Sequence, residues 1–287
     1  MSSIIVKDIE VFKDIDFPFF VEHGTLNNNY ELHSHEFIEL FIIVKGKSGH
    51  IIGNVNQEIH AGDIFVIKSN ELEHGFINPK GLELFNFSFS NKFLEGFCRE
   101  IYHIPGYQTL FVISPFLASK PGYRNYFKLP PKGLITAIDL ANKICKEQET
   151  EKIAYKTMIK SLFIELIVHL LREYEKPPGS KETKNIKRLE KSLVFLEKNY
   201  RQRPSISQLA DIACISERQF QRIFKNCFHT TPLYYINSLR LRDSKYFLAE
   251  KKYSIAEIAY KCGFDNPNYF TRAFKKEFGI PPTKYLE

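Results

Sequence analysis

The sequence predicts an α+β protein of two domains: a β-barrel or sandwich with two covering helices, followed by an all-α domain. Three observations support this prediction. Short segments rich in Ile, Val and Phe alternate with glycine-containing turns between about residues 18 and 90. Two prolines and a glycine interrupt the chain near residue 177. The last hundred residues contain two copies of one helical pattern, offset by 49 or 50 positions. A chain of 287 residues is long enough for two such domains.

The N-terminal region contains four clear strand candidates. They share a high content of β-branched and aromatic residues, and they cover residues 37–44, 50–54, 64–68 and 82–88. Glycines such as Gly46 and Gly53, and the segment Pro79-Lys80-Gly81, are expected to form the turns between them. Closely spaced short strands of this kind are typical of a barrel or sandwich.

Three histidines and a glutamate in this region form a candidate ligand site. His33 and His35 should point to the same side of a strand, and Glu39 shares that face four residues later. With Gly46 they fit the pattern H-x-H-x-x-x-E-x-x-x-x-x-x-G, and residues 62–74, ending at His74, give a weaker second half.

These two segments resemble the cupin motifs, which build a small β-barrel. Lys68 and Asn70 replace the proline and glycine of the second motif, and His74 lies one residue late. Three histidines and a carboxylate could hold zinc, iron or manganese. The same side chains could instead line a metal-free pocket for a sugar or an acid, or they could be purely structural. We expect a metal-free ligand contact and no cofactor, with the ligand-binding residues His33, His35, Glu39 and His74.

Two amphipathic helices are predicted after a mixed segment at residues 93–126. Their apolar stripes are Leu134, Ile138, Ala141 and Cys145 in the first, and Ile159, Leu162, Phe163, Leu166, Ile167 and Leu170 in the second. The simplest expectation is that both stripes pack against the barrel. We therefore place the first domain at residues 1–175, a linker rich in proline and charge at 176–187, and the second domain at 188–287.

Each copy of the C-terminal repeat reads as a helix, a short turn and a second helix. The matched residues are Ser205, Ile206, Ala210, Phe220, Arg222, Phe224, Lys225 and Phe228 in the first copy, and Ser254, Ile255, Ala259, Phe270, Arg272, Phe274, Lys275 and Phe278 in the second. Ser205 and Ser254 are expected to cap the first helices, and Ser216 and Asn266 (or Asp265) the second. The phenylalanines recur at i, i+4 and i+8, so we expect them in the core.

The outer faces of the two second helices carry polar side chains that suit DNA. Arginine can pair with guanine, and Gln or Asn with adenine, whereas lysine suits phosphates. The candidates are Arg218, Gln219, Gln221, Arg222 and Lys225 in the first copy, and Asn268, Thr271, Arg272, Lys275 and Lys276 in the second. The alternative is that these polar side chains contact only solvent, because an ordinary exposed helix face would show the same pattern. A helix expected at residues 232–250 would hold the two faces about one DNA turn apart, roughly 34 Å.

Residues from about 188 to 286 resemble the DNA-binding domain of the AraC/XylS family of bacterial transcription regulators. The segments that carry the resemblance are Ser207-Gln208-Leu209-Ala210, Phe220-Gln221-Arg222-Ile223-Phe224-Lys225, residues 255–264 and residues 268–282. The resemblance implies base contacts by Arg218, Gln221, Arg222, Asn268, Thr271 and Arg272. Cys214 replaces the usual turn glycine, His229 replaces another glycine, and Ser244 stands where alanine is usual. The family resemblance also implies that the two helices after the barrel could form an antiparallel dimer contact.

Charge and cysteine content agree with a DNA-binding protein. Residues 181–287 contain 21 of the 40 Lys and Arg but only 11 of the 33 Asp and Glu. A basic domain joined to a slightly acidic one favours a polyanion partner. Five cysteines without a C-x-x-C pair exclude a disulfide scaffold and argue against a structural zinc site. We expect a soluble, cytoplasmic protein without a secretory signal or a membrane contact.

The sequence therefore predicts a sequence-specific DNA-binding transcription regulator, an activator by analogy, that is not an enzyme. The expected partners are double-stranded promoter DNA, a small effector that is most simply a sugar, RNA polymerase, and a second copy of the chain. Two alternatives stay open at this point. One is a cupin-type metal enzyme fused to a DNA-binding domain, and the other is a ligand-independent regulator controlled by oligomerisation or a protein partner.

Overall fold

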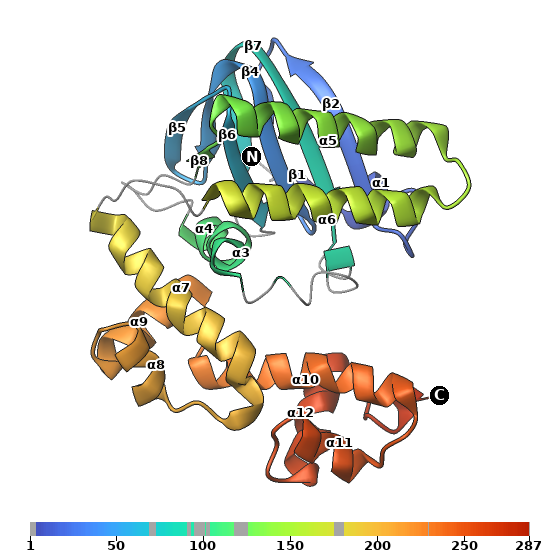
Figure 1. The fold of residues 1–287 in the computed structure, drawn as a ribbon, viewed down its shortest axis with the longest axis vertical. Coiled ribbons are helices and arrows are strands. Elements are labelled where there is room, and N and C mark those ends of the chain that lie inside the picture. The colour runs from blue at the N-terminus through green and yellow to red at the C-terminus, as the bar shows by residue number, and fades with distance from the viewer. Residues whose placement is uncertain are drawn as a thin grey trace. The chain divides into compact units, whose positions relative to one another are not determined.

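The computed structural model describes residues 4–68, 73–90, 93–94, 101, 104–117, 126–174, 181–228 and 230–286. The chain divides into two compact units, residues 1–184 and 185–287. The first unit holds all the strands, and the second consists of helices (Figure 1). The predicted α+β class with a β-rich first domain and an all-α second domain is confirmed.

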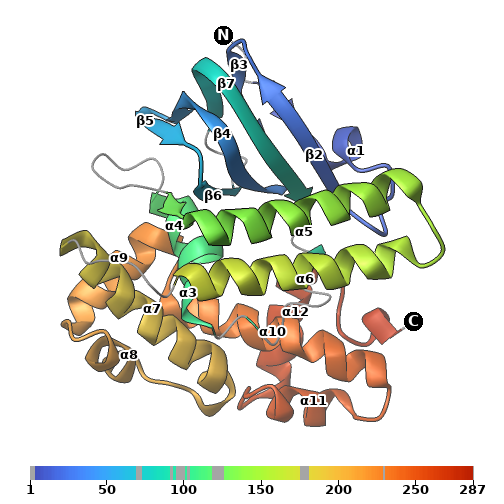
Figure 2. The same cartoon turned by 45° about the horizontal axis from the view of Figure 1, so that its top comes forward.

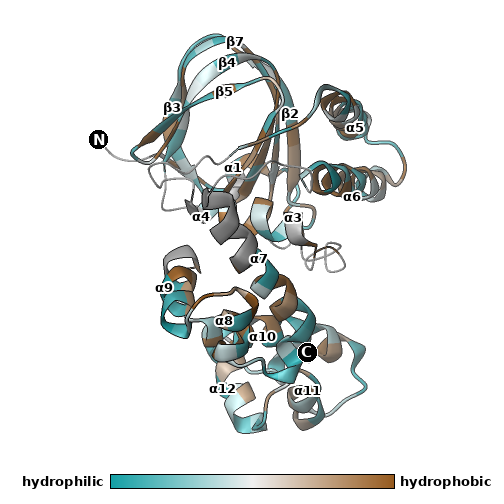
Figure 3. Ribbon diagram, turned by 60° about the vertical axis from the view of Figure 1, so that its left-hand side comes forward, coloured by the Kyte–Doolittle hydropathy of each residue, from teal (hydrophilic) through white to brown (hydrophobic). Residues whose placement is uncertain are grey.

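One curled sheet forms the centre of the first unit. Its strands are β1 (Ile4–Val6), β2 (Phe19–Leu26), β3 (Tyr30–His35), β4 (Ile38–Ile52), β5 (Val55–His60), β6 (Asp63–Lys68), β7 (His74–Phe89) and β8 (Phe127–Lys128). The order is β1-β3-β7-β4-β6-β8, with β2 paired to β7 and β5 paired to β4. The long strands β4 and β7 run antiparallel along most of their length, and the sheet curls around an interior (Figure 3).

The turn expected at Gly46 is wrong, because β4 continues through this glycine. Gly46 has φ +79°, and a Cβ atom placed there would lie 2.1 Å from the carbonyl oxygen of Gly81 on β7. The glycine therefore allows a close approach of two backbones inside the sheet, where the register between β4 and β7 shifts. Before the shift Phe41 and Ile43 face the interior, whereas after it Ile52 does, so the alternation along β4 is reversed.

Two long helices cover one face of the sheet. Helix α5 (Pro131–Thr150) and helix α6 (Tyr155–Tyr174) lie side by side against it (Figures 1 and 2). Their predicted apolar stripes, which include Phe163, join one core with facing strand residues such as Leu40 and Phe87. The expectation that the stripes pack on the barrel is confirmed. The smaller helices of this unit are α1 (Asp8–Val11), α3 (Pro105–Tyr107), the π-helix η1 (Gln108–Ile113) and α4 (Ser114–Leu117).

The second unit contains both copies of the predicted helix-turn-helix repeat. Its elements are α7 (Lys181–Asn199), η2 (Tyr200–Gln202), α8 (Ile206–Ile212), α9 (Glu217–Phe228), α10 (Pro232–Glu250), α11 (Ile255–Lys261), α12 (Pro267–Phe278) and η3 (Lys284–Leu286). Helix α10 has the predicted bounds. The Ser205 and Ser254 side chains accept hydrogen bonds from backbone N–H groups in the first turns of α8 and α11, as expected of N-caps.

The phenylalanine stripes form the core of the repeat, as predicted. Phe220, Phe224, Phe270 and Phe274 are fully buried. Phe224 contacts Phe220 and Phe228 on its own helix, and Phe274 repeats this arrangement on α12. Burying these rings on one side of each helix leaves the opposite side polar and exposed.

The predicted linker at residues 176–187 needs a correction. Residues 176–180 lie outside the described residues, but residues 181–187 are already helical and form the start of α7. The segment Lys181-Glu182-Thr183-Lys184 contains no proline or glycine, so its charge does not prevent a helix once the chain has passed Gly179. No helix in the described part of the chain is long and apolar enough to cross a membrane.

Candidate nucleic-acid interface and effector site

The outer face of α9 presents the side chains expected to meet DNA. The predicted contact residues of the first copy are all exposed, namely Arg218, Gln219, Gln221, Arg222 and Lys225. They lie on the side of the helix opposite the buried phenylalanines. None of these five side chains takes part in an ion pair within the described residues. The face is therefore available for a polyanion.

Helix α12 presents a matching face in the second copy. Asn268, Arg272, Lys275 and Lys276 are exposed. Thr271 is half-buried, and its hydroxyl donates to the carbonyl oxygen of Pro267 at 2.9 Å. The Thr271 hydroxyl is thus already used within the helix, and its methyl group is the part that remains for a base.

Ser216 and Asn266 stand at the starts of these two helices. The Ser216 hydroxyl accepts from the Gln219 N–H at 3.3 Å, and the Asn266 amide oxygen accepts from the Asn268 N–H at 2.8 Å. Both residues are therefore caps, as predicted. Because a helix N-terminus favours a nearby anion, each cap also lies where a DNA phosphate would be stabilised.

Helix α10 separates the two faces and is held firmly by α7 and η2. Its 19 residues span about 28 Å at 1.5 Å per residue. The Arg240 side chain donates to the carbonyl oxygen of Tyr200 at 2.8 Å, and the Arg201 Nε donates to the buried Asp243 at 2.7 Å. Burial raises the pKa of Glu197, while the neighbouring Arg242 guanidinium at 3.3 Å acts in the opposite direction. These buried polar contacts fix α10 relative to α7.

The histidine and glutamate side chains predicted to bind a ligand meet inside the curled sheet. His35 Nε2 lies 3.1 Å from His74 Nε2 and 3.1 Å from Glu39 Oε2, and His74 Nε2 lies 3.0 Å from the same oxygen. A ring nitrogen of His33 lies within 4.8 Å of the Glu39 and His74 atoms. All four side chains are buried. The structure therefore brings together every predicted ligand-binding residue.

Backbone carbonyls fix the orientation of two of these rings. His33 Nδ1 lies 3.0 Å from the carbonyl oxygen of Glu31, and His35 Nδ1 lies 2.8 Å from that of Phe37. Because a carbonyl only accepts, each Nδ1 must carry the proton, and in the neutral ring each Nε2 then offers a lone pair.

Two atoms of the cluster lack a satisfactory hydrogen bond. Glu39 Oε2 has close histidine neighbours but no contact of hydrogen-bond geometry, and His74 Nδ1 has no partner within the described residues. Burial by itself would raise the pKa of Glu39, but the contacts with His35 and His74 outweigh it and hold the pKa well below its usual value. The unpaired Oε2 of the ionised Glu39 carboxylate could be satisfied by a cation or by a ligand that donates hydrogen bonds.

The cluster fits a divalent cation. Imidazole nitrogens and a carboxylate are the ligands that zinc, iron and manganese accept in proteins. The contacts of Nδ1 with backbone carbonyls are those that orient metal-binding histidines. His33, His35, Glu39 and His74 are the residues that could hold such an ion.

Asn86 belongs to this site, although the sequence analysis did not select it. Its Nδ2 donates to Glu39 Oε1 at 2.7 Å, and its own buried Oδ1 has no partner among the residues that the structure describes. The sequence signal was a single amide between Phe85 and Phe87 in a strand with phenylalanine at every other position. An isolated polar residue among buried ones often marks a contact with another buried polar group.

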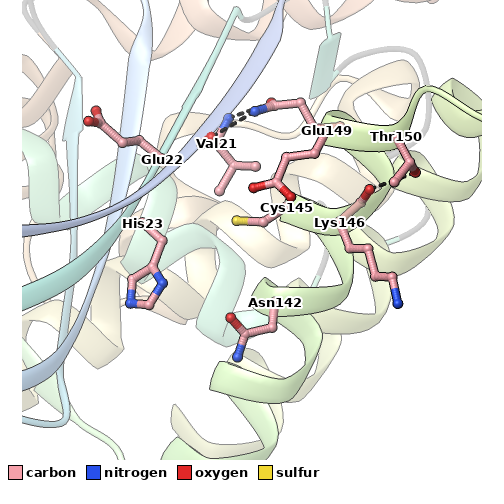
Figure 4. A pocket seen from close by; sticks show the side chains of 9 residues that line it. Val21, Glu22, His23, Asn142, Cys145, Lys146, Glu149 and Thr150 are labelled. Atoms are coloured by element: carbon pink, nitrogen blue, oxygen red, sulfur yellow. Dashed lines mark hydrogen bonds between the residues drawn. The ribbon is translucent and has the colours of Figure 1, made fainter.

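A pocket of about 540 Å³ lies on the outside of the sheet, between β2 and α5 (Figure 4). The Gln148 side chain in its wall makes two hydrogen bonds to the backbone of Val21, both 2.8 Å long. Burial raises the pKa of the Cys145 thiol to about 11, so this thiol is a poor nucleophile. None of the nine residues that line the pocket has a buried polar atom without a partner. The interior cluster is therefore the better candidate effector site.

Comparisons with known proteins match part of each unit to a known domain family. Residues 19–135 match the AraC-like ligand binding domain, and residues 209–287 match a helix-turn-helix domain. The HTH-type transcriptional activator RhaR of Cronobacter sakazakii is 24% identical over 284 residues, which cover 98% of this chain and 95% of the relative. The HTH-type transcriptional activator RhaS of Pectobacterium carotovorum is 25% identical, over 91% and 89% of the two chains.

Solved structures give a further comparison. A crystal structure of a transcriptional regulator with an AraC-type DNA-binding domain from Chromobacterium violaceum is 28% identical, with a TM-score of 0.33. The matched part covers 34% of this chain and 88% of that one.

Proposed function

The chain is an AraC-family protein, an AraC-like ligand-binding domain joined to an AraC-family helix-turn-helix domain, and from this premise we propose that it activates transcription in response to a small effector. The observation that carries the proposal is the pair of exposed, polar helix faces on α9 and α12 in a chain that also encloses a buried polar cluster. The activators RhaR and RhaS, similar over nearly their whole length, support the same function.

We propose that α9 and α12 enter successive segments of the major groove. Arg222 and Arg272 would read guanine, Gln221 and Asn268 would read adenine, and Arg218 and Thr271 would complete the base contacts. Gln219, Lys225 and Lys275 would contact phosphates, with the helix starts at Ser216 and Asn266 close to the backbone. The exposure of these side chains, apart from the half-buried Thr271, supports these roles.

We expect DNA binding to depend strongly on salt. Each phosphate contact made by Lys or Arg releases counterions, and log K falls with log salt with a slope of about −0.9 per contact. The two cationic phosphate contacts, Lys225 and Lys275, give an expected slope of roughly −2, and any phosphate contact by the base-reading arginines would make it steeper. Fluorescence anisotropy of a labelled duplex at several salt concentrations measures it. A slope near zero would contradict an electrostatic interface.

The effector is proposed to bind inside the curled sheet, where His33, His35, Glu39 and His74 meet. The partnerless atoms Glu39 Oε2 and His74 Nδ1 support a ligand at this place. A sugar suits the site because its hydroxyls both donate and accept hydrogen bonds. Its differential affinity for two states of the protein would shift the population that binds promoter DNA. A thermal-shift screen of sugars and organic acids tests this step.

A second candidate is that the same cluster holds a divalent metal, as the tautomers fixed by the carbonyls of Glu31 and Phe37 favour. When bound, the metal would neutralise Glu39 and could attract an oxygen of the effector. This candidate predicts close to one equivalent of metal in protein purified without chelators or a nickel column, and its loss in Glu39→Gln. The exposed-site control His60→Gln should keep the metal. Less than a tenth of an equivalent of metal in the wild-type protein would contradict this candidate and favour the metal-free effector site.

Three further roles are proposed on the family relationship. Two copies of the chain would pair, with α5 and α6 as the contact, because AraC-like domains offer this surface. The DNA-bound activator would contact RNA polymerase. A protein that acts on promoter DNA would work in the cytoplasm of a bacterium, and we propose no enzymatic activity.

A further inference from the structure

A groove of about 380 Å³ runs between α10 and α12, beside the face of α12 that is proposed to read bases. Tyr234 and Asn237 line it from α10, and Tyr269, Arg272 and Lys276 line it from α12. The roles proposed above use only Arg272 of these five residues. The other polar side chains of the groove therefore have no assigned role.

The charge of the groove favours an anion. Arg272 and Lys276 lie four residues apart on α12, and neither takes part in an ion pair among the residues that the structure describes. Glu277 is the one acidic side chain in the lining, and its Oε2 accepts a hydrogen bond from the Tyr234 hydroxyl at 2.8 Å. Two cations thus face a single carboxylate, and the carboxylate is already engaged.

The Tyr269 hydroxyl has a proton that no group of the described chain accepts. Asn237 Nδ2 donates to the Tyr269 oxygen at 3.1 Å. The Asn237 amide is oriented from its other side, because Arg240 Nη1 can only donate and lies 3.5 Å from Asn237 Oδ1. Since the amide group that meets Tyr269 is a donor, the hydroxyl proton of Tyr269 is left for a ligand in the groove.

Tyr234 is the contrasting phenol of the same groove. The two tyrosines are nearly equally exposed, at 45% for Tyr269 and 47% for Tyr234. The Tyr234 hydroxyl donates to Glu277, and this hydrogen bond raises the pKa of Tyr234. Tyr234 would therefore have to break a contact before it could donate to an anion, whereas Tyr269 would not.

A phosphodiester of the DNA backbone matches these groups. Its oxygens accept hydrogen bonds from neutral hydroxyls and from lysine alike. Tyr269, Arg272 and Lys276 stand at i, i+3 and i+7 of α12, so they share one side of the helix. Because Arg272 belongs both to the groove and to the proposed base-reading face, the groove continues the DNA interface, and a phosphate of the duplex is favoured over a free anion.

We propose that this groove seats one backbone phosphate of the operator, bound by the Tyr269 hydroxyl and the Lys276 ammonium, and that Asn237 is a positioning residue for Tyr269. The inference rests on the proposed DNA-binding function, and it adds a phosphate site to it. It also gives α10 a part in recognition, since Asn237 on α10 determines which way the Tyr269 proton points.

Ethylation interference on an operator selected from randomised duplexes tests the proposal with the full-length chain. In this method each phosphate is ethylated in turn, and the phosphates whose ethylation prevents binding are identified. The variants are Tyr269→Phe and Lys276→Gln. The matched control is Tyr234→Phe, which removes a hydroxyl of similar exposure whose proton is already used.

One interfering phosphate beside the half-site of α12 should disappear in both variants, while the others remain. Tyr269→Phe should weaken operator binding by about 5- to 30-fold, the loss of one hydrogen bond to a charged group. Its salt dependence should stay unchanged because the hydroxyl is neutral, whereas Lys276→Gln should make the slope shallower by about 0.9. Tyr234→Phe should keep the wild-type affinity and every interfering phosphate.

A double-mutant cycle tests the positioning role of Asn237. Asn237→Ala should weaken operator binding in the wild-type background, because the Tyr269 hydroxyl loses the donor that orients it. In the Tyr269→Phe background it should cause no further loss, since the group that it orients is absent. A merely structural Asn237 would give the same loss in both backgrounds, and that result would remove Asn237 from the proposal.

Three further results would overturn the phosphate site. The first is an unchanged interference pattern in Tyr269→Phe, and the second is an equal loss of affinity in Tyr234→Phe. The third uses inorganic phosphate at millimolar concentration and constant ionic strength. If it raised the melting temperature of the wild-type protein but not of Lys276→Gln, the groove would belong to a free anion. A wild-type protein that selects no operator would reject the regulator function itself, whereas these three results leave that function intact.

Discussion

Replacing Gly263 by alanine is expected to destabilise the second helix-turn-helix motif by roughly 2–4 kcal/mol. Gly263 has φ +91°, and a Cβ atom at this position would lie 2.6 Å from the carbonyl oxygen of Arg201 and 2.9 Å from its Cα. The backbone of Arg201 cannot move away easily, because Arg201 is also bound to Asp243 on α10. The substitution therefore forces apart η2 and the turn between α11 and α12.

Cys214 provides the matched control in the first motif. It occupies the equivalent turn position with φ +53° and is exposed. The sequence departs from the family pattern here, and the turn nevertheless keeps its left-handed conformation. Cys214→Ala should change stability by less than about 0.5 kcal/mol, because Cys214 is exposed and a residue with a Cβ atom already adopts this conformation.

Hydrogen exchange followed by mass spectrometry separates the two variants, since it reports on single helices of a chain with two domains. Peptides from α11 and α12 should exchange much faster in Gly263→Ala, and peptides from α8 and α9 should not do so in Cys214→Ala. Unchanged protection of α12 in Gly263→Ala would contradict the close approach seen at Arg201.

Arg272→Ala should reduce base discrimination by roughly 1–3 kcal/mol. Arg272 is exposed on the outer face of α12, where a guanidinium can reach two acceptors of guanine. Binding to a specific duplex should weaken by this amount, while binding to a scrambled duplex should change little. Fluorescence anisotropy with both duplexes at one salt concentration gives the comparison.

Lys275→Ala is the comparison for Arg272→Ala. Lys275 lies one turn further along α12 and is also exposed. As a phosphate contact, it should contribute nearly equally to specific and scrambled duplexes. An equal loss on both duplexes in Arg272→Ala would make Arg272 a phosphate contact as well, and would remove it from the base-reading residues.

The helical domain was largely predictable because its signals are local. A serine before an apolar run predicted the caps at Ser205 and Ser254, and phenylalanines four residues apart predicted the buried stripe. Pro232 and the apolar periodicity after it predicted α10 with its correct bounds. Each of these signals acts within one or two helical turns, so the chain sequence alone contains it.

The ligand site was only partly predictable, because part of it depends on contacts between distant strands. His33, His35 and Glu39 were found from their spacing along neighbouring strands. The interior position of His50 was missed because the approach of Gly46 to Gly81 reverses the alternation of β4, and the sequence near position 50 does not indicate this contact between distant segments. The early start of α7 was missed for another reason, since the prolines, the glycine and the alternating charges of residues 175–184 were interpreted together as a linker.

The central claim is that one chain places α9 and α12 in successive major-groove segments of the same duplex. The most direct measurement uses an operator selected from randomised duplexes, with the two contacted half-sites moved apart by half a helical turn, about five base pairs. Because α10 is rigidly held by Arg240 and Asp243, the spacing cannot adapt, and affinity should fall to that of a scrambled duplex. An affinity that does not change with the insertion would show that only one of the two helices reads DNA.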